Sequence, residues 1–488
     1  NVFWRRKFLQ TNGDKMRRIS LMLTITLLFG LEIFAQPSID GQTLKEESKD
    51  TLSLSQNDKT LDVGDESSQS SSGKETASDK EEIENLKGAL DGLNESYLET
   101  KSTVDALKKI KISGYIQAQF QSGEIDGTSA AGSGGDFPKN MHNRFAIRRG
   151  RLKASYDNDI TQYVLQINVD EKGLGLKDAY ASIKDPWIKT FGLTAGVFNR
   201  PFGFEVPYSS SDLESPERTR FNQTLFPGEE DMGAQLEITP QDGPLSCFNL
   251  KAGIFSGNGI AQETDNYKDF IGRLGFKFPF EEENLAIDGG LSTYIGAVRV
   301  EDGKSLYKLN SPTTFQRDSL TRKSDRLYYG ADLQLYYDLP VLGGFTIRGE
   351  YVTGKNPGSS SSNKPYTYAV GNSDVFLRNI ACYYITYVQN IGLSNQFVLK
   401  YESYDPNTDV KGDDIKGASG SKLSSADIKF STLGVGWNYF WDSNVKFTLF
   451  YDIVKNEKVN PSVTAASLAP YKDDLKDNVL TLRMQIKF

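Results

Sequence analysis

Arginine and lysine side chains recur at every second residue in one stretch of the chain. Arg149, Arg151 and Lys153 show this spacing, and alternate residues of a β-strand point to the same face. A guanidinium group stays charged and can hold an oxyanion with two hydrogen bonds. A row of such side chains along the wall of a channel would therefore attract anions.

Further cations occupy equivalent polar positions in other stretches. The other candidate anion contacts on predicted strands are Lys251, Arg273, Arg348, Lys446 and Arg483. With Lys277, Lys400 and Lys487 added, eleven cations on predicted strands share the inward face with six acids. These acids are Asp170, Asp178, Asp332, Glu350, Glu402 and Asp452. The excess of cations predicts a mild anion preference, because a low-dielectric wall focuses the field of its charges. The alternative is that these charges pair across the wall.

Other kinds of chemistry find little support in the sequence. His142 is the only histidine, which excludes His-based triads and metal sites built from several histidines. There is no phosphate-binding loop or dinucleotide fingerprint, and a net charge of -8 argues against nucleic-acid binding. We therefore expect no enzyme activity, no cofactor and no metal. Cys247 and Cys382 are expected to be unpaired.

These cations must be positioned by strands, because apolar and polar residues alternate from residue 112 to the end. In the last segment, Leu480, Leu482, Met484, Ile486 and Phe488 share one face, and polar residues share the other. Such segments of about ten residues are typical of membrane-spanning strands. Sixteen are expected, near 112–121, 145–157, 160–170, 176–184, 190–198, 233–240, 247–256, 270–279, 286–299, 326–338, 344–353, 376–388, 393–404, 428–440, 445–456 and 476–488.

The connections between these segments alternate in length. Long polar ones, such as 122–144 and 199–232, alternate with short ones, such as 158–159 and 441–444, although 171–175 is a short exception. This asymmetry predicts an all-β fold, a transmembrane antiparallel β-barrel in a bacterial outer membrane. A soluble β-sandwich is the weaker alternative. The last strand must pair with the first, because no backbone group can face lipid unpaired.

The segment 145–157 has an irregular pattern. Phe145 and Ile147 share parity with Arg149, although the apolar and basic residues should face opposite ways. A β-bulge near 148–150 would shift the phase and turn all the cations inward.

The N-terminal part divides into four segments. Residues 1–15 lie upstream of a plausible start and are treated as foreign or upstream sequence, and 16–35 reads as a signal peptide. The polar stretch 36–80 is expected to be a disordered linker. Residues 81–109 carry apolar residues at heptad spacing, which predicts a periplasmic coiled-coil helix between subunits. The alternative is a helix that packs on its own barrel. The barrel itself is expected over 110–488.

Four stretches resemble the phosphate-selective porin O and P family, in particular its Bacteroidetes-type members. They are Arg148–Leu152, Leu176–Tyr180, Gly196–Gly203 and Pro216–Arg218. The resemblance implies a sixteen-stranded trimeric barrel with an inward third loop and a basic lumen, and a coiled coil in some members. It also implies anion contacts at Arg149, Arg151, Arg218 and Arg220. The segment 199–232 departs from the pattern, because it holds seven acids and three arginines.

The sequence therefore predicts an outer-membrane porin, a homotrimer surrounded by lipid. Small hydrophilic solutes would diffuse through it passively, with a mild preference for anions, phosphate among them. The alternative is a structural or adhesive envelope protein, whose barrel is plugged and whose loops and coiled coil bind partners.

Overall fold

A computed structural model describes residues 77–365, 373–418 and 420–488 of the chain. The segment 1–15, the predicted signal peptide 16–35 and residues 36–76 of the predicted linker lie outside the described residues. The last four residues of that linker, 77–80, belong to the first described helix.

The first described element is the helix α3, Ala77–Lys108, which starts earlier than predicted. Its heptad residues are exposed, Leu86, Leu90 and Leu93 among them. This leaves an apolar stripe uncovered within the single chain. No helix in the described part of the chain is both long and apolar enough to cross a membrane.

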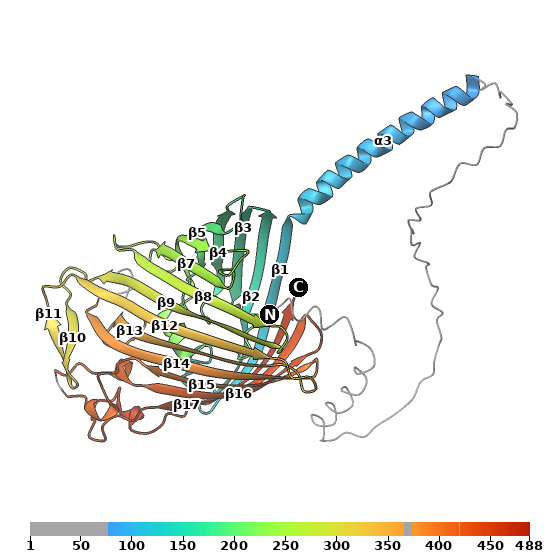
Figure 1. The fold of residues 1–488 in the computed structure, drawn as a ribbon. Coiled ribbons are helices and arrows are strands. Elements are labelled where there is room, and N and C mark those ends of the chain that lie inside the picture. Colours follow the sequence, from blue (N-terminus) through green and yellow to red (C-terminus); the bar gives the residue numbers. More distant parts are fainter. Residues whose placement is uncertain (1–76, 366–372, 419) are drawn as a thin grey trace, which may run out of the picture. The chain divides into compact units, whose positions relative to one another are not determined.

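Sixteen strands form a closed antiparallel barrel, as predicted, and Figure 1 shows them side by side. The strands are β1 (Ile110–Gly123), β2 (Asn143–Asn158), β3 (Thr161–Asp170), β4 (Gly173–Lys184), β5 (Phe191–Asn199), β6 (Glu230–Ile238), β7 (Phe248–Phe255), β8 (Asp269–Phe280), β9 (Leu285–Arg299), β12 (Lys323–Tyr337), β13 (Phe345–Gly358), β14 (Val375–Ile391), β15 (Asn395–Asp405), β16 (Phe430–Phe440), β17 (Val445–Asn456) and β18 (Val479–Lys487). Each predicted segment overlaps one of these strands, because the two-residue alternation is a local signal.

The barrel closes between its first and last strands. β18 pairs with β1 from Lys487 opposite Tyr115 to Val479 opposite Gly123. The terminal Phe488 extends this ladder, since its backbone exchanges hydrogen bonds of 3.0 and 3.1 Å with Gly114. Leu482, Met484 and Ile486 of β18 are exposed on the outer surface, where lipid would contact them.

A β-bulge interrupts the pairing of β1 with β2, as the sequence predicts. Gln117 lies opposite Arg149 and Ala118 lies opposite Ile147, so Arg148 is the extra residue. Phe145 and Ile147 consequently face outward and are exposed, whereas Arg149 is buried inside the barrel. The bulge thus reconciles an apolar outer face with a basic inner face on one strand.

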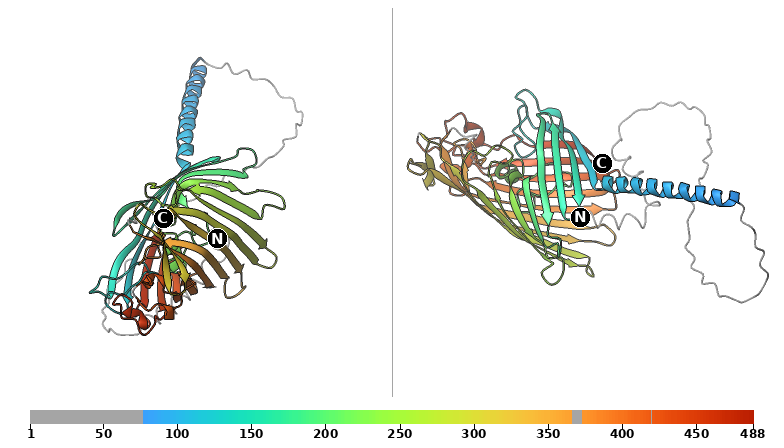
Figure 2. Two further views of the ribbon diagram at one scale, coloured as in Figure 1. Left: turned by 90° about the vertical axis from the view of Figure 1, so that its left-hand side faces the viewer. Right: turned by 90° about the horizontal axis from the view of Figure 1, so that it is seen from above.

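The long loops lie at one end of the barrel and the short turns at the other (Figures 1 and 2). The loop between β9 and β12 contains a hairpin that the sequence analysis missed, β10 (Leu306–Ser311) and β11 (Thr314–Asp318). β10 also pairs in parallel with the start of β14. Side chains of β10 and of the start of β14 join an apolar core that several long loops share. Tyr307, Phe376 and Ile428 belong to this core.

The largest apolar cluster lies inside the barrel. It joins Phe202, Phe221 and Phe226, from the loop after β5, to inward side chains such as Tyr294 and Tyr328. The short helix α4, Arg220–Leu225, belongs to the same loop, and the Thr219 side chain caps its first turn. The interior of the barrel is therefore partly filled by its own chain.

Candidate functional site: the constriction of the barrel

The loop between β5 and β6, which we call the inner loop (residues 200–229), folds into the barrel. The Lys446 ammonium donates to the carbonyl of Leu213 at 2.9 Å, and the Gln485 amide donates to that of Ser211 at 3.0 Å. These donors lie on β17 and β18, far from the inner loop in sequence. The loop therefore crosses the lumen and narrows it.

The start of the inner loop is held by β9 and β13. The Gly203 amide donates to the Ser292 hydroxyl at 2.9 Å, and the Glu205 amide donates to a Glu350 carboxylate oxygen at 3.2 Å. Gly203 has a φ of +59°, and a Cβ there would lie 1.8 Å from the Glu350 carboxylate. Glycine is required at this position by both backbone conformation and space.

The centre of the constriction is a group of four residues that we call the Glu217 cluster: Arg148, Arg149, Glu217 and Arg483. The Glu217 carboxylate accepts hydrogen bonds of 2.8 Å from Arg148, 2.8 Å from Arg149 and 2.7 Å from Arg483. Burial alone would raise the pKa of Glu217, but the three guanidinium groups outweigh it and hold the pKa well below its usual value. Glu217 is therefore ionised at neutral pH.

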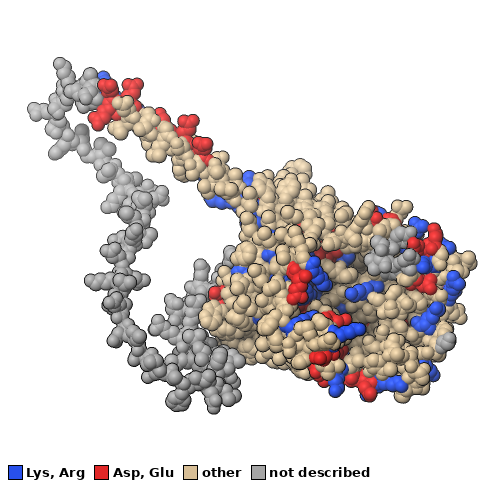
Figure 3. Space-filling model, turned by 180° about the vertical axis from the view of Figure 1, so that it is seen from behind, with Lys and Arg blue, Asp and Glu red and all other residues tan. Residues whose placement is uncertain are grey.

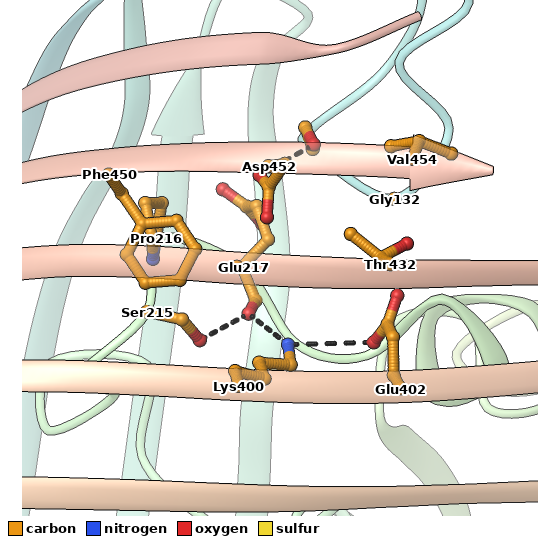
Figure 4. Close-up of a pocket in the computed structure, with 12 residues that line it drawn as sticks. Gly132, Ser215, Pro216, Glu217, Lys400, Glu402, Thr432, Phe450, Asp452 and Val454 are labelled. Carbon is orange, nitrogen blue, oxygen red and sulfur yellow. Dashed lines mark hydrogen bonds and ion pairs between the residues drawn. The ribbon is translucent and has the colours of Figure 1, made fainter. Parts of the chain in front are cut away.

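Behind the inner loop lies a small polar cavity (Figure 4). Lys400 lies between Glu217 and Glu402: its ammonium donates to the Glu217 carbonyl at 3.2 Å and lies 3.6 Å from the Glu402 carboxylate. On the opposite side, the Ser133 hydroxyl donates to Asp452 at 2.8 Å. Charged side chains thus line the contact between the loop and the wall, where they hold the loop in place.

Half of the other predicted anion contacts also have carboxylate partners. Arg273 lies 2.6 Å from Asp332, Arg218 lies 3.2 Å from Glu229, and Lys251 lies 3.7 Å from Glu237. Arg348 pairs with Glu214 of the inner loop. The alternative of charge pairing therefore describes much of the interior, and the excess of cations is smaller than the count of residues suggests.

Four predicted residues have other surroundings. The Arg220 guanidinium lies 4.2 Å from the Phe430 ring, and Lys446 donates to the inner loop. Arg151 lies opposite Tyr115, with its guanidinium 5.7 Å from the ring. Lys153 follows on the same inner face of β2, opposite Gln166. Arg151 and Lys153 are half-buried.

The two walls of the barrel differ in exposure near the short turns. On β14–β18, inward side chains are buried against the inner loop and their neighbours. These are Thr386, Gln396, Asn438, Thr448 and Gln485. On β3–β8, several inward side chains are half-exposed, namely Gln162, Asn168, Thr194, Lys251 and Arg273, although Gln166 and Gln235 are buried. We call the first the covered wall and the second the open wall.

The residues that carry the constriction were only partly visible in the sequence. Glu217 and Arg148 lie within two of the stretches that resemble porins, but neither was selected as a site residue. Lys177, which pairs with Glu229 and Glu230, was also missed. The available signal was the excess of acids in 199–232, because acids on an inward loop need cations on the wall. Figure 3 shows blue and red side chains mixed within a hollow of the molecule.

Comparison with known proteins finds no matching family model and no matching curated protein. Solved structures do match. OprB of Pseudomonas putida at high pH has 10% identity and a TM-score of 0.49, covering 79% of this chain and 96% of that one. The outer membrane channel DcaP of Acinetobacter baumannii has 13% identity and a TM-score of 0.46, covering 78% and 97%. An anion-selective porin from Comamonas acidovorans has 11% identity and a TM-score of 0.46, covering 78% and 99%.

At these identities the likeness concerns the fold alone. The described part of this chain itself forms a closed barrel of sixteen antiparallel strands. The narrower resemblance to the phosphate-selective porin O and P family stays a prediction.

Proposed function

We propose that the protein is an outer-membrane porin through which small hydrophilic solutes diffuse passively. The observation that carries the proposal is the inner loop, which is fixed against the covered wall and leaves the open wall half-exposed. A sixteen-strand barrel is wide enough to hold water beside such a loop. The half-exposed wall would form the side of the solute path.

The proposal includes a mild preference for anions, phosphate among them. The inner face of β2 carries Arg144, Arg148, Arg149, Arg151 and Lys153. Among the ion pairs of the described residues, Glu217 is the carboxylate that pairs with this row of cations, through Arg148 and Arg149. Acids such as Asp178 on β4 and Glu237 on β6 lie on the open wall. This distribution favours a weak anion preference over a strict anion filter.

We further propose that the protein works as a homotrimer, with α3 in the periplasm. The exposed heptad stripe of α3 supports this, since an apolar seam of this length is stabilised when helices associate. The start of β1, which directly follows α3, and the end of β18 lie at the rim that carries the short turns. This rim is the expected periplasmic side of an outer-membrane barrel.

Planar lipid bilayers test the proposal directly. Purified protein should give discrete conductance steps in KCl, and a KCl gradient should give a reversal potential of the sign expected for a mild anion preference. A reversal potential of the sign expected for cation preference would contradict the proposed anion preference, but it would still demonstrate an open pore. Protein that inserts and never conducts would contradict the porin function.

One observation favours the alternative of a structural or adhesive barrel. The long loops share an apolar core of their own, with Phe315, Phe376 and Val459 among its members. Such an ordered surface could bind a partner. Binding of the outer loops to envelope or surface material, in a protein without conductance, would support this alternative.

A further inference from the structure

The Glu217 cluster is not neutral. Three guanidinium groups share one carboxylate, and three positive charges with one negative charge leave a net charge of +2. The inner loop also forms an ion pair with β13, between Glu214 and Arg348. In this pair one negative charge balances one positive charge. The Glu217 cluster therefore carries an excess of positive charge that the Arg348–Glu214 pair does not.

The members of the cluster differ in exposure. The side chains of Arg149 and Arg483 are 6% and 3% exposed, and that of Glu217 is 4% exposed. The Arg148 side chain is 27% exposed. Arg148 is also the extra residue of the β-bulge in β2, so the bulge places it beside Arg149 on the inner side. Arg148 is thus the arginine through which the cluster reaches solvent in the lumen.

We propose that Glu217 and Arg148 determine the charge selectivity of the pore, a proposal that rests on the porin function. Glu217 fixes three arginines in one place and cancels one of their charges. Arg148 presents the remaining charge to the solute path, where it attracts small anions such as chloride or inorganic phosphate. The charges act strongly there, because the surrounding groups are desolvated.

The proposal separates these residues from the predicted basic row. Arg273 and Lys251 each have one carboxylate partner, so their pairs contribute little net charge. Arg151 and Lys153 lie closer to the turns, beyond the point where the inner loop meets β2. The Glu217 cluster instead joins the loop to the wall, where the passage is narrowed and a charge has its largest effect on permeation.

The experiment compares reversal potentials of full-length variants in a KCl gradient. Arg148→Gln should lower the ratio of chloride to potassium permeability several-fold, with conductance changed less than the ratio. Glu217→Gln should raise this ratio, because it leaves three charges where there were two. Arg322→Gln, at an exposed arginine of the long loop after β9, is the matched control and should leave the ratio unchanged.

The outcomes distinguish the inference from the function beneath it. Wild-type protein that does not conduct would refute the porin function. A conducting wild type whose permeability ratio is unaltered by Arg148→Gln would overturn the inference alone. Heat-modifiable migration in gels verifies that each variant is folded. If Glu217→Gln fails this check, Arg149→Gln replaces it, and a fall in the ratio there supports the cluster while an unchanged ratio counts against it.

Discussion

At the scale of single residues, buried charge in this barrel is held by partners from distant parts of the chain. Arg149 and Glu217 are 68 residues apart, and Arg483 and Glu217 are 266 apart. Another such pair lies among the long loops, where Arg378 and Asp427 are 2.8 Å apart and both side chains are fully buried. Removing one partner of a buried pair leaves the other charge without compensation, which is more costly than losing the pair as a whole.

This argument predicts the effect of Asp427→Ala. The substitution strands the Arg378 guanidinium and also removes the acceptor of the Asn407 amide. It should destabilise the packed long loops by about 3–5 kcal/mol, measured by urea titration with limited proteolysis of the loop as readout. Asp413→Ala, at an exposed acid of the same loop, is the control and should change little. Equal protease sensitivity of the two variants would contradict the prediction.

The sequence could place the cations on the inner face but could not pair them. Strand parity and the bulge follow from neighbouring residues, so Arg149, Arg151 and Lys153 were oriented correctly. Pairing depends on where the inner loop meets the far wall, which no local pattern encodes. The acids of 199–232 showed that partners were available, and the structure shows which ones they are.

At the scale of elements, the inner loop decides how wide the passage is. Its apolar part packs Phe202 against Phe226, with ring centroids 4.9 Å apart, and its polar part is tied to strands around the barrel. The loop enters this arrangement through Gly203, whose position leaves no room for a Cβ beside Glu350. A single carbon atom added at Gly203 would therefore be expected to shift the start of the inner loop.

Gly203→Ala should displace the start of the inner loop. The added Cβ would overlap the Glu350 carboxylate and would also strain the backbone at positive φ. We expect single-channel conductance to change in size or to become noisier, as measured in planar bilayers. Gly228→Ala is the matched control, because Gly228 also has a positive φ of +82° but has open space around it. If both variants behave alike, backbone strain rather than displacement is responsible.

The helix α3 is the second element with a testable role. Leu90 and Leu93 lie on its exposed apolar stripe, and replacing both with Lys should oppose helix association. The proposed trimer should then become less stable, as measured by light scattering of the detergent-solubilised protein, while the barrel stays folded. Glu95→Gln, at an exposed position away from the stripe, should leave the mass unchanged. A monomeric wild-type protein would contradict the proposed coiled coil between subunits.

The strands were predictable because each carries its own alternation, whereas the β10–β11 hairpin was not. It is short, and part of its pairing is a parallel contact of three residues with β14, a partner about seventy residues away. The resemblance implied that the inner loop enters the lumen, but the residues of the loop do not encode this course. Its entry depends on contacts with strands that follow it in sequence, such as β17 and β18.

At the scale of the whole barrel, the two walls have different roles. The covered wall supports the inner loop, and the proposed solute path runs along the open wall. Thr194 and Thr448 allow the two walls to be compared, since each is the fourth residue of its strand, β5 and β17 respectively, counted from the short turn. Thr194 is half-exposed, whereas Thr448 is buried and its hydroxyl donates to Asn438 at 2.5 Å.

Cysteine labelling can measure this difference. Thr194→Cys and Thr448→Cys are introduced singly into a Cys247→Ser background, because Cys247 is partly exposed while the other free thiol, Cys382, is buried. A charged, water-soluble thiol reagent should modify Cys at position 194 quickly and reduce the channel current. The same reagent should react slowly at position 448, because the inner loop and neighbouring side chains exclude it. Equal rates at both positions would mean that water reaches both walls, and the inner loop would then have to leave the covered wall in solution.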